Sequence, residues 1–152
     1  SRGLGDVYKR QDGTRIAYAS FFGSVFQFFD SSDPRNIRLV REYRFAEPAY
    51  LPASDPGQQS YFVRWEKDFR NGALATAFNK EGFFVLCEEG KLVSDKDWRM
   101  STVYFFDWDG NPRKKLNLGR RVQTIACNEI SNQLIALTVD EQEQYAFVAY
   151  DL

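Results

Sequence analysis

The chain repeats one pair of apolar segments three times, and no other feature restricts its fold as much. The first member of the pair reads RIAYAS at residues 15–20, FFVLCE at 83–88 and LIALTV at 134–139. The second member is rich in aromatic residues and ends in aspartate: VFQFFD at 25–30, TVYFFD at 102–107 and AFVAYD at 146–151. Short runs of β-branched and aromatic residues between turn residues are typical of strands. The sequence therefore predicts a unit with at least two consecutive strands that occurs three times.

The spacing of these units is typical of a β-propeller. The second and third units begin about 50 residues apart, and propeller blades recur at periods of roughly 40–50 residues. The first unit lies further from the second because a stretch at 46–72 intervenes, with Pro48, Pro52, Pro56 and Gly57 as breaks. We expect this stretch to be an irregular insertion.

Polar residues mark the outermost strand of each predicted blade. A propeller blade is a four-stranded antiparallel sheet, and neighbouring blades cover both faces of its middle strands. The outer strand faces solvent, where charges discourage edge-to-edge pairing. Polar residues follow the aromatic strands of the first two units: Arg38, Arg41 and Glu42, then Arg113, Lys114, Lys115 and Asn117. The third unit lacks such a strand, which in closed propellers the other end of the chain often supplies.

These patterns predict an all-β chain, since no segment of adequate length shows the 3.6-residue apolar period of a helix. We expect one domain at residues 12–152, a β-propeller fragment of about two and a half four-stranded antiparallel blades. The expected blades span approximately 12–45, 73–118 and 122–152. Separate strands are expected at 113–118 and 122–127. Residues 1–11 resemble a translated sequencing-adapter remnant, so we interpret them as a non-native leader and exclude them from the predicted fold.

A hairpin at residues 102–118 is the clearest local prediction, with DWDGNP as its turn. Gly110 provides backbone angles that other residues avoid. Asp107, Asp109 and Asn111 do not match the calcium-loop pattern, because glycine follows Asp109 directly. We interpret this turn as structural.

Composition removes several classes of function. The chain has no histidine, and therefore lacks the commonest general base, the Ser-His and Cys-His pairs and histidine-ligated metal sites. Cys87 and Cys127 lie in apolar strand-like segments, which predicts buried, unreactive thiols. The net charge of -1 gives no general attraction to nucleic acid, and no apolar stretch approaches the roughly 20 residues of a membrane span. We expect no catalytic residue, no cofactor, no bound metal, no nucleic-acid partner and no transmembrane segment.

Two long connections offer the best candidates for binding. In a four-stranded antiparallel blade, the loop between strands two and three emerges at the same end as the connection from strand four to the next blade. The loop at 90–101 is of the first kind and the insertion at 46–72 is of the second, so both should lie at one end. Aromatic and arginine side chains are frequent anchors in binding sites. The candidate ligand-binding or partner-binding residues are Tyr61, Arg64, Trp65, Asp97, Trp98 and Arg99. The alternative is that these side chains only hold the loops onto the sheets.

The segment FFDWDGNPRKKLNL at 105–118, with the residues that follow it to the final YDL, resembles the C-terminal part of the TolB-like six-bladed β-propeller proteins of Bacteroidetes. In that family the last complete blade ends in a similar hairpin, and a further blade closes with a short strand. The resemblance is close over 83–152 and looser over 12–152. It implies a cell-envelope protein made with a lipoprotein or secretion signal. It adds little about activity, because the function of the family is largely unassigned.

The leading functional hypothesis is a non-enzymatic binding or interaction module of the bacterial cell envelope, whose loop-bearing face contacts a protein or a glycan. The alternative is a metal-dependent lactonase or hydrolase of the six-bladed type, with acidic and amide ligands at the axis. The inner strands offer Thr76, Gln123 and Thr124 but no carboxylate, so such a site would lie in blades outside this sequence. A purely structural role is the third hypothesis. Unpaired strand edges predict that the chain aggregates or forms loose oligomers when expressed alone.

Overall fold

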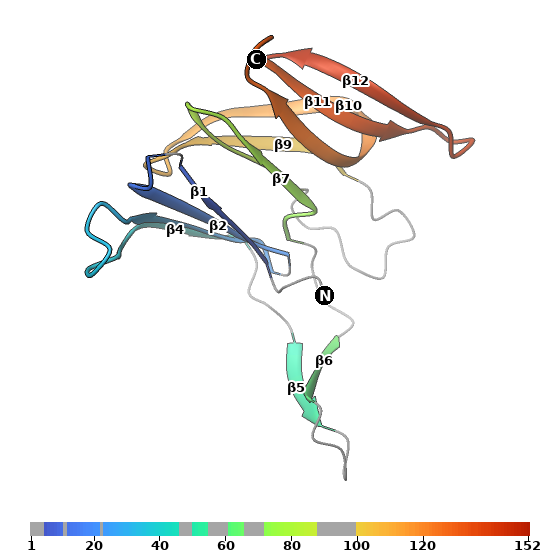
Figure 1. Ribbon diagram of the computed structural model, residues 1–152. Helices are drawn as coiled ribbons and strands as arrows, with labels where there is room; N and C mark the ends of the chain where they lie inside the picture. Colours follow the sequence, from blue (N-terminus) through green and yellow to red (C-terminus); the bar gives the residue numbers. More distant parts are fainter. Residues whose placement is uncertain are drawn as a thin grey trace.

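The computed structural model describes residues 5–10, 12–21, 23–45, 50–54, 61–65, 72–87 and 100–152, with the backbone alone at 5–8, 50–54, 61–65 and 100. In this part of the chain every regular element is a β-strand. Antiparallel pairing joins the strands into three sheets (Figure 1). The predicted all-β class is confirmed.

Strands that are consecutive in the sequence are neighbours in each sheet. The strands are β1 (Gly5–Lys9), β2 (Arg15–Ser20), β3 (Val25–Asp30), β4 (Arg38–Arg44), β5 (Tyr50–Ser54), β6 (Tyr61–Trp65), β7 (Ala75–Phe78), β8 (Gly82–Leu86), β9 (Met100–Asp107), β10 (Pro112–Asn128), β11 (Gln133–Val139) and β12 (Tyr145–Asp151). The sheet orders are β1-β2-β3-β4, β5-β6 and β12-β11-β10-β9-β8-β7. Such meanders need only local connections, as the blades of a propeller do.

The strand register reproduces the threefold repeat of the sequence. We name β1–β4 blade 1. Blade 2 is β7, β8, β9 and residues 112–118 of β10, and blade 3 is residues 122–128 of β10 with β11 and β12. The aspartate that ends the third strand of each blade lies opposite the first residue of the second strand. The register pairs are Arg15 with Asp30, Gly82 with Asp107 and Gln133 with Asp151. The predicted partial propeller is therefore confirmed, with two four-stranded blades and one three-stranded blade.

β10 is one strand where two separate strands were expected at 113–118 and 122–127. It pairs first with β9 and then with β11. Gly119 lies where the partner changes and has a φ of 64°. A glycine at positive φ can redirect a strand without a turn, and shifts in register mark this region of β10. Blades 2 and 3 consequently form one continuous, curled sheet (Figure 1).

The fold includes β1, although this strand lies within residues 1–11, which the sequence analysis excluded from the predicted fold. It pairs with β2 along its whole length, from Gly5 opposite Ser20 to Lys9 opposite Ile16. The edge of β2 offers unpaired backbone groups, which any segment with strand propensity can satisfy. This segment therefore takes the position of the first strand of blade 1. Its non-native origin stays a prediction.

The insertion at 46–72 also contains a regular element, contrary to the irregular structure expected. β5 and β6 form an antiparallel hairpin in which Pro52 lies opposite Val63. Both strands of a two-stranded sheet are edge strands, where proline is tolerated. The hairpin projects away from the two larger sheets (Figure 1).

The blades stack face to face, and aromatic side chains fill the layer between blades 1 and 2. Phe26 and Phe28 of β3 meet Phe106 of β9, with ring centroids 5.8 Å and 5.3 Å apart. A second buried layer separates blades 2 and 3. Its main members are Phe84, Leu86, Val103, Phe105, Val122, Ile125, Leu134 and Ala136. Alternate residues of a strand point to opposite faces, so blade 2 contributes to both layers.

Candidate functional site

The two long connections leave the sheets at the same end, as predicted. Before the insertion at 46–72, the backbone N–H of Phe45 donates to the carbonyl of Ser24 at 3.2 Å. At its last residue, the backbone N–H of Gly72 donates to the carbonyl of Phe21 at 3.0 Å. Cys87, which precedes the second connection, lies with its sulfur 3.8 Å from the hydroxyl of Ser24. The flanking residues of both connections therefore converge beside the β2–β3 turn.

The candidate binding residues lie beyond these flanking residues. Tyr61, Arg64 and Trp65 belong to β6, of which the structure describes the backbone. Asp97, Trp98 and Arg99 lie outside the described residues. The binding role of all six residues stays a prediction.

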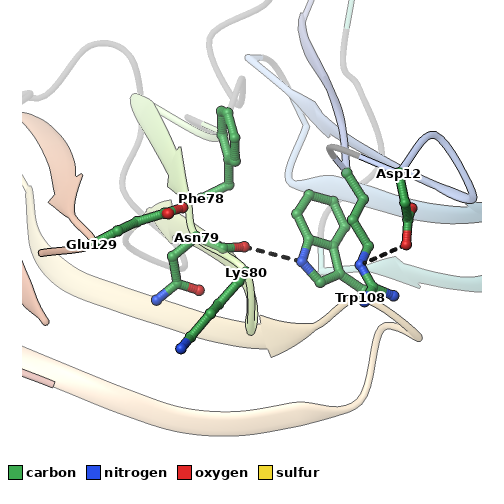
Figure 2. Close-up of a pocket in the computed structure, with 7 residues that line it drawn as sticks. Asp12, Phe78, Asn79, Lys80, Trp108 and Glu129 are labelled. Atoms are coloured by element: carbon green, nitrogen blue, oxygen red, sulfur yellow. Dashed lines mark hydrogen bonds and ion pairs between the residues drawn. The ribbon is translucent and has the colours of Figure 1, made fainter.

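A recess lies at the opposite end of the sheets, where short turns of all three blades meet (Figure 2). Its volume is about 210 Å³. The lining residues are Arg10, Asp12, Phe78, Asn79, Lys80, Trp108 and Glu129. Arg10 and Asp12 come from the β1–β2 turn, Lys80 from the β7–β8 turn and Glu129 from the β10–β11 turn. The recess is thus a product of blade stacking, because no single blade supplies its wall.

Trp108 and Asn79, both from blade 2, form one hydrogen-bonded side of the recess. The indole Nε1 of Trp108 donates to the backbone carbonyl of Asn79 at 3.1 Å (Figure 2). The side-chain oxygen of Asn79 accepts the backbone N–H groups of Glu81 and Gly82 at 2.9 and 3.0 Å. Phe78 packs edge-on against Trp108, with centroids 6.3 Å apart. These hydrogen bonds fix the β7–β8 turn and the indole in one orientation.

Charged groups of both signs surround this aromatic wall. The guanidinium of Arg10 pairs with the carboxylate of Asp12 at 3.3 Å. The backbone N–H of Thr14, and then its hydroxyl, donate to Asp12 and lower the pKa of that carboxyl. Lys80 and Glu129 are exposed at the rim. Such a recess suits a small group with an apolar part and a charge.

The sequence prediction missed this recess, although one signal for it was present. Trp108 is a large apolar residue in the middle of the DWDGNP turn, where polar and small residues are usual. Its indole is only 5% exposed because it packs under the neighbouring turn.

The DWDGNP segment forms the turn of the hairpin between β9 and β10, as predicted, and this turn also joins blade 2 to blade 1. The guanidinium of Arg15 donates to Asp109 at 2.9 Å, and the hydroxyl of Tyr43 donates to the carbonyl of Gly110 at 2.9 Å. Gly110 has a φ of 78°, and a Cβ there would lie 2.6 Å from the ring of Phe28. Glycine is therefore required both by the backbone conformation and by the approach of β3.

Asp107 is the centre of this turn. Burial acts to raise its pKa, but hydrogen bonds from the side chain and backbone of Asn111, with those from Arg113, outweigh burial and lower the pKa. The same carboxylate accepts the backbone N–H of Asp109 at 3.0 Å. Donors from the turn itself thus occupy this carboxylate, which explains why aspartate ends the strand.

The prediction of buried thiols is confirmed for Cys87 and only in part for Cys127. Cys87 is 0% exposed. Cys127 is half-buried, and burial, followed by the charge of Glu129, raises the pKa of its thiol to about 12. The Cys127 thiol is therefore protonated and a weak nucleophile at neutral pH.

Within the ranges that the structure describes, no three or more Cys, Asp or Glu side chains gather in a group able to hold a metal ion. In the same part of the chain, no helix has the length and apolarity needed to cross a membrane.

Of the comparisons with known proteins, only the comparison with solved structures finds a similarity. No protein-family model matches the chain, and no curated protein matches it. A chain of the outer coat vertex of COPII on membranes is 9% identical with a TM-score of 0.40, and the match covers 99% of this chain and 47% of that one. The β-propeller domain of Cps50 (Swd1) from Myceliophteria thermophila is 8% identical with a TM-score of 0.34, covering 93% of this chain and 49% of that domain. A chain of the mitotic checkpoint complex is 6% identical with a TM-score of 0.29, and the match covers 95% of this chain and 62% of that one. This chain thus spans between 47% and 62% of the length of these three solved chains. Its assignment as a partial β-propeller rests on its own strand register and blade packing.

Proposed function

We propose that this chain is part of a non-enzymatic β-propeller binding module, and that the end carrying the two long connections contacts the partner. The observation that carries the proposal is the convergence of both connections beside the β2–β3 turn, through Phe45, Gly72 and Cys87. Long connections on a rigid sheet scaffold are where binding residues usually lie. The contact residues proposed are Tyr61, Arg64, Trp65, Asp97, Trp98 and Arg99.

We further propose that the module belongs to the TolB-like six-bladed propellers of Bacteroidetes and works in the cell envelope, on a protein or a glycan. The DWDGNP hairpin and the residues after it support this relationship. The reading frame upstream of this segment provides the test. Further copies of the blade unit behind a lipoprotein or secretion signal are expected, and a cytosolic protein with unrelated upstream sequence would contradict the proposal.

Binding is tested by substituting the two tryptophan candidates, Trp65→Ala and Trp98→Ala, in the longest natural protein that contains this segment. The probes are a bacterial glycan array and an envelope-protein extract read by crosslinking. Each substitution should reduce capture of the same probe at least tenfold, as expected for aromatic anchors. Arg35→Ala, in the exposed β3–β4 turn at the opposite end of the sheets and outside the recess, is the matched control and should leave capture unchanged. Undiminished capture by both tryptophan variants, with an unchanged melting temperature, would refute the proposed contact surface.

A further inference from the structure

The outer strands of blades 1 and 2 carry an excess of positive charge. β4 and residues 112–118 of β10 hold seven charged side chains, of which six are basic: Arg38, Arg41, Arg44, Arg113, Lys114 and Lys115. The whole chain, in contrast, has 20 basic and 21 acidic residues. Protection of a strand edge requires charge but not this excess of one sign. The fourth strand of a blade lies at the circumference of a propeller, whatever the number of blades.

Neighbouring carboxylates neutralise only part of this charge. Three of the arginines form ion pairs: Arg38 with Asp30 at 3.5 Å, Arg44 with Glu42 at 2.6 Å and Arg113 with Asp107 at 2.6 Å. The exposed carboxylate of Asp109 pairs with Arg15 at 2.9 Å. Among the residues that the structure describes, Arg41 and Lys114 are exposed and have no carboxylate partner. Two cations of the outer strands are therefore available to an anionic partner.

Arg41 and Lys114 occupy the same place in the repeat. Arg41 lies opposite Phe28, and Lys114 lies opposite Phe105. Each of these phenylalanines comes two residues before the aspartate that ends the third strand of its blade. In both outer strands a shift in register directly precedes the cation. Blades 1 and 2 thus each present one available cation at an equivalent position of the outer strand.

The packing of blade 1 on blade 2 sets the surface between the two cations. The Cβ of Arg41 lies 3.2 Å from the place that a Cβ would take at Gly110, in the turn that leads to Lys114. Stacked sheets lie about 10 Å apart, so equivalent positions of neighbouring blades are separated by at least about that distance. Val40, next to Arg41, is 45% exposed, and Pro112, two residues before Lys114, is also exposed. Each cation therefore has an exposed apolar side chain close to it in the sequence.

We propose that the outer strands of blades 1 and 2 bind a linear acidic polysaccharide in which uncharged sugars separate the carboxylate groups. Successive carboxylates would pair with Arg41 and Lys114, and the C–H faces of the sugar rings would contact Val40 and Pro112. The charges of such a polymer are widely spaced, as the two cations are. Phosphates of a nucleic-acid strand follow one another much more closely, at about 3.4 Å along the axis of a duplex. This surface is separate from the long connections of the proposed function and does not depend on them.

The first test measures binding of hyaluronan oligosaccharides, whose uronic acids alternate with uncharged sugars, to the longest natural protein that contains this segment. Isothermal titration calorimetry at low and raised salt should show binding that weakens with salt, because salt screens exposed charges. Single-stranded DNA, polyglutamate and neutral dextran of similar length are the comparison probes and should bind more weakly. Tighter binding of DNA or polyglutamate would overturn the assignment to a polysaccharide, and equal binding of dextran would exclude a role for the cations.

Substitutions in the same protein test where the polysaccharide binds. Arg41→Gln and Lys114→Gln should each weaken hyaluronan binding about threefold, and the double variant about tenfold, because each removes one exposed ion pair. Lys80→Gln is the matched control, since it makes the same charge change in the exposed β7–β8 turn, between the two inner strands of blade 2. This control and Trp98→Ala should leave binding unchanged. Equal losses for Lys80→Gln and Arg41→Gln, a loss confined to Trp98→Ala, or no binding of hyaluronan to the wild-type protein would each overturn the proposal.

Discussion

Gly110→Ala should destabilise the chain more than the same substitution at a glycine that also has a positive φ but has open space where a Cβ would lie. The alanine would be held at a φ of 78°, and a left-handed backbone costs a residue with a Cβ about 1–2 kcal/mol. Its Cβ would also lie 2.6 Å and 2.8 Å from two ring atoms of Phe28, and overpacking of this kind costs about 1–3 kcal/mol. The free energy of unfolding should therefore fall by about 2–5 kcal/mol.

Urea unfolding followed by far-ultraviolet circular dichroism measures this change. Gly119→Ala is the matched control, because Gly119 has a φ of 64° but nothing lies within 4 Å of the place that a Cβ would take there. It should cost about 1–2 kcal/mol, which is the backbone contribution alone. Phe28→Leu combined with Gly110→Ala should recover part of the packing penalty and give a non-additive double mutant. Equal losses for Gly110→Ala and Gly119→Ala would refute the close approach of blade 1 to the turn.

The same contacts predict three further results. Trp108→Phe should cost about 1–3 kcal/mol in urea unfolding, since it leaves the buried carbonyl of Asn79 without its donor; an unchanged midpoint would contradict this. The folded pKa of Asp107 is lowered, so its stabilisation is complete above the unfolded pKa of about 3.9 and is lost as pH falls through the folded pKa. Asp107→Asn should remove that part of the acid-induced loss of stability below about pH 4, whereas an identical acid profile would count against the hydrogen-bond network. Cys87 should react with a thiol reagent only after unfolding because it is buried, and Cys127 should react slowly at about pH 8 because the pKa of its thiol is raised; rapid reaction of both thiols in the folded chain would contradict this prediction.

The parts of the fold that follow from local patterns were predictable from the sequence. The aromatic strands that end in Asp30, Asp107 and Asp151 are set by residue type, by alternation and by the turn chemistry that follows them. Their equivalence predicted the three blade units of this segment.

The remaining elements depend on partners that a local pattern does not specify. β1 forms because β2 has a free edge beside it, and the hairpin of β5 and β6 forms although Pro52 reads as a breaker. β10 is continuous because Gly119 bends the chain while hydrogen bonding passes from β9 to β11. Each outcome is decided by tertiary pairing rather than by propensity.

The candidate sites divide in the same way, into features that follow from local sequence patterns and features that depend on tertiary contacts. The common end of the two long connections followed from antiparallel geometry and is confirmed at Phe45, Gly72 and Cys87. The recess around Trp108 was missed because its wall comes from turns of three blades that are far apart in the sequence. A turn residue as large as tryptophan was the one available signal.

The central claim is that the repeated sheets stack face to face, with the DWDGNP turn of blade 2 packed against β3 of blade 1. Nuclear Overhauser spectroscopy of the isotope-labelled chain tests it directly, through the contact between the Gly110 α-protons and the Phe28 ring. The packing predicts a strong cross-peak between these groups, together with one between the rings of Phe28 and Phe106, whose centroids lie 5.3 Å apart. Absence of both cross-peaks, with those between β9 and β10 intact, would show that the blades fold separately and do not stack.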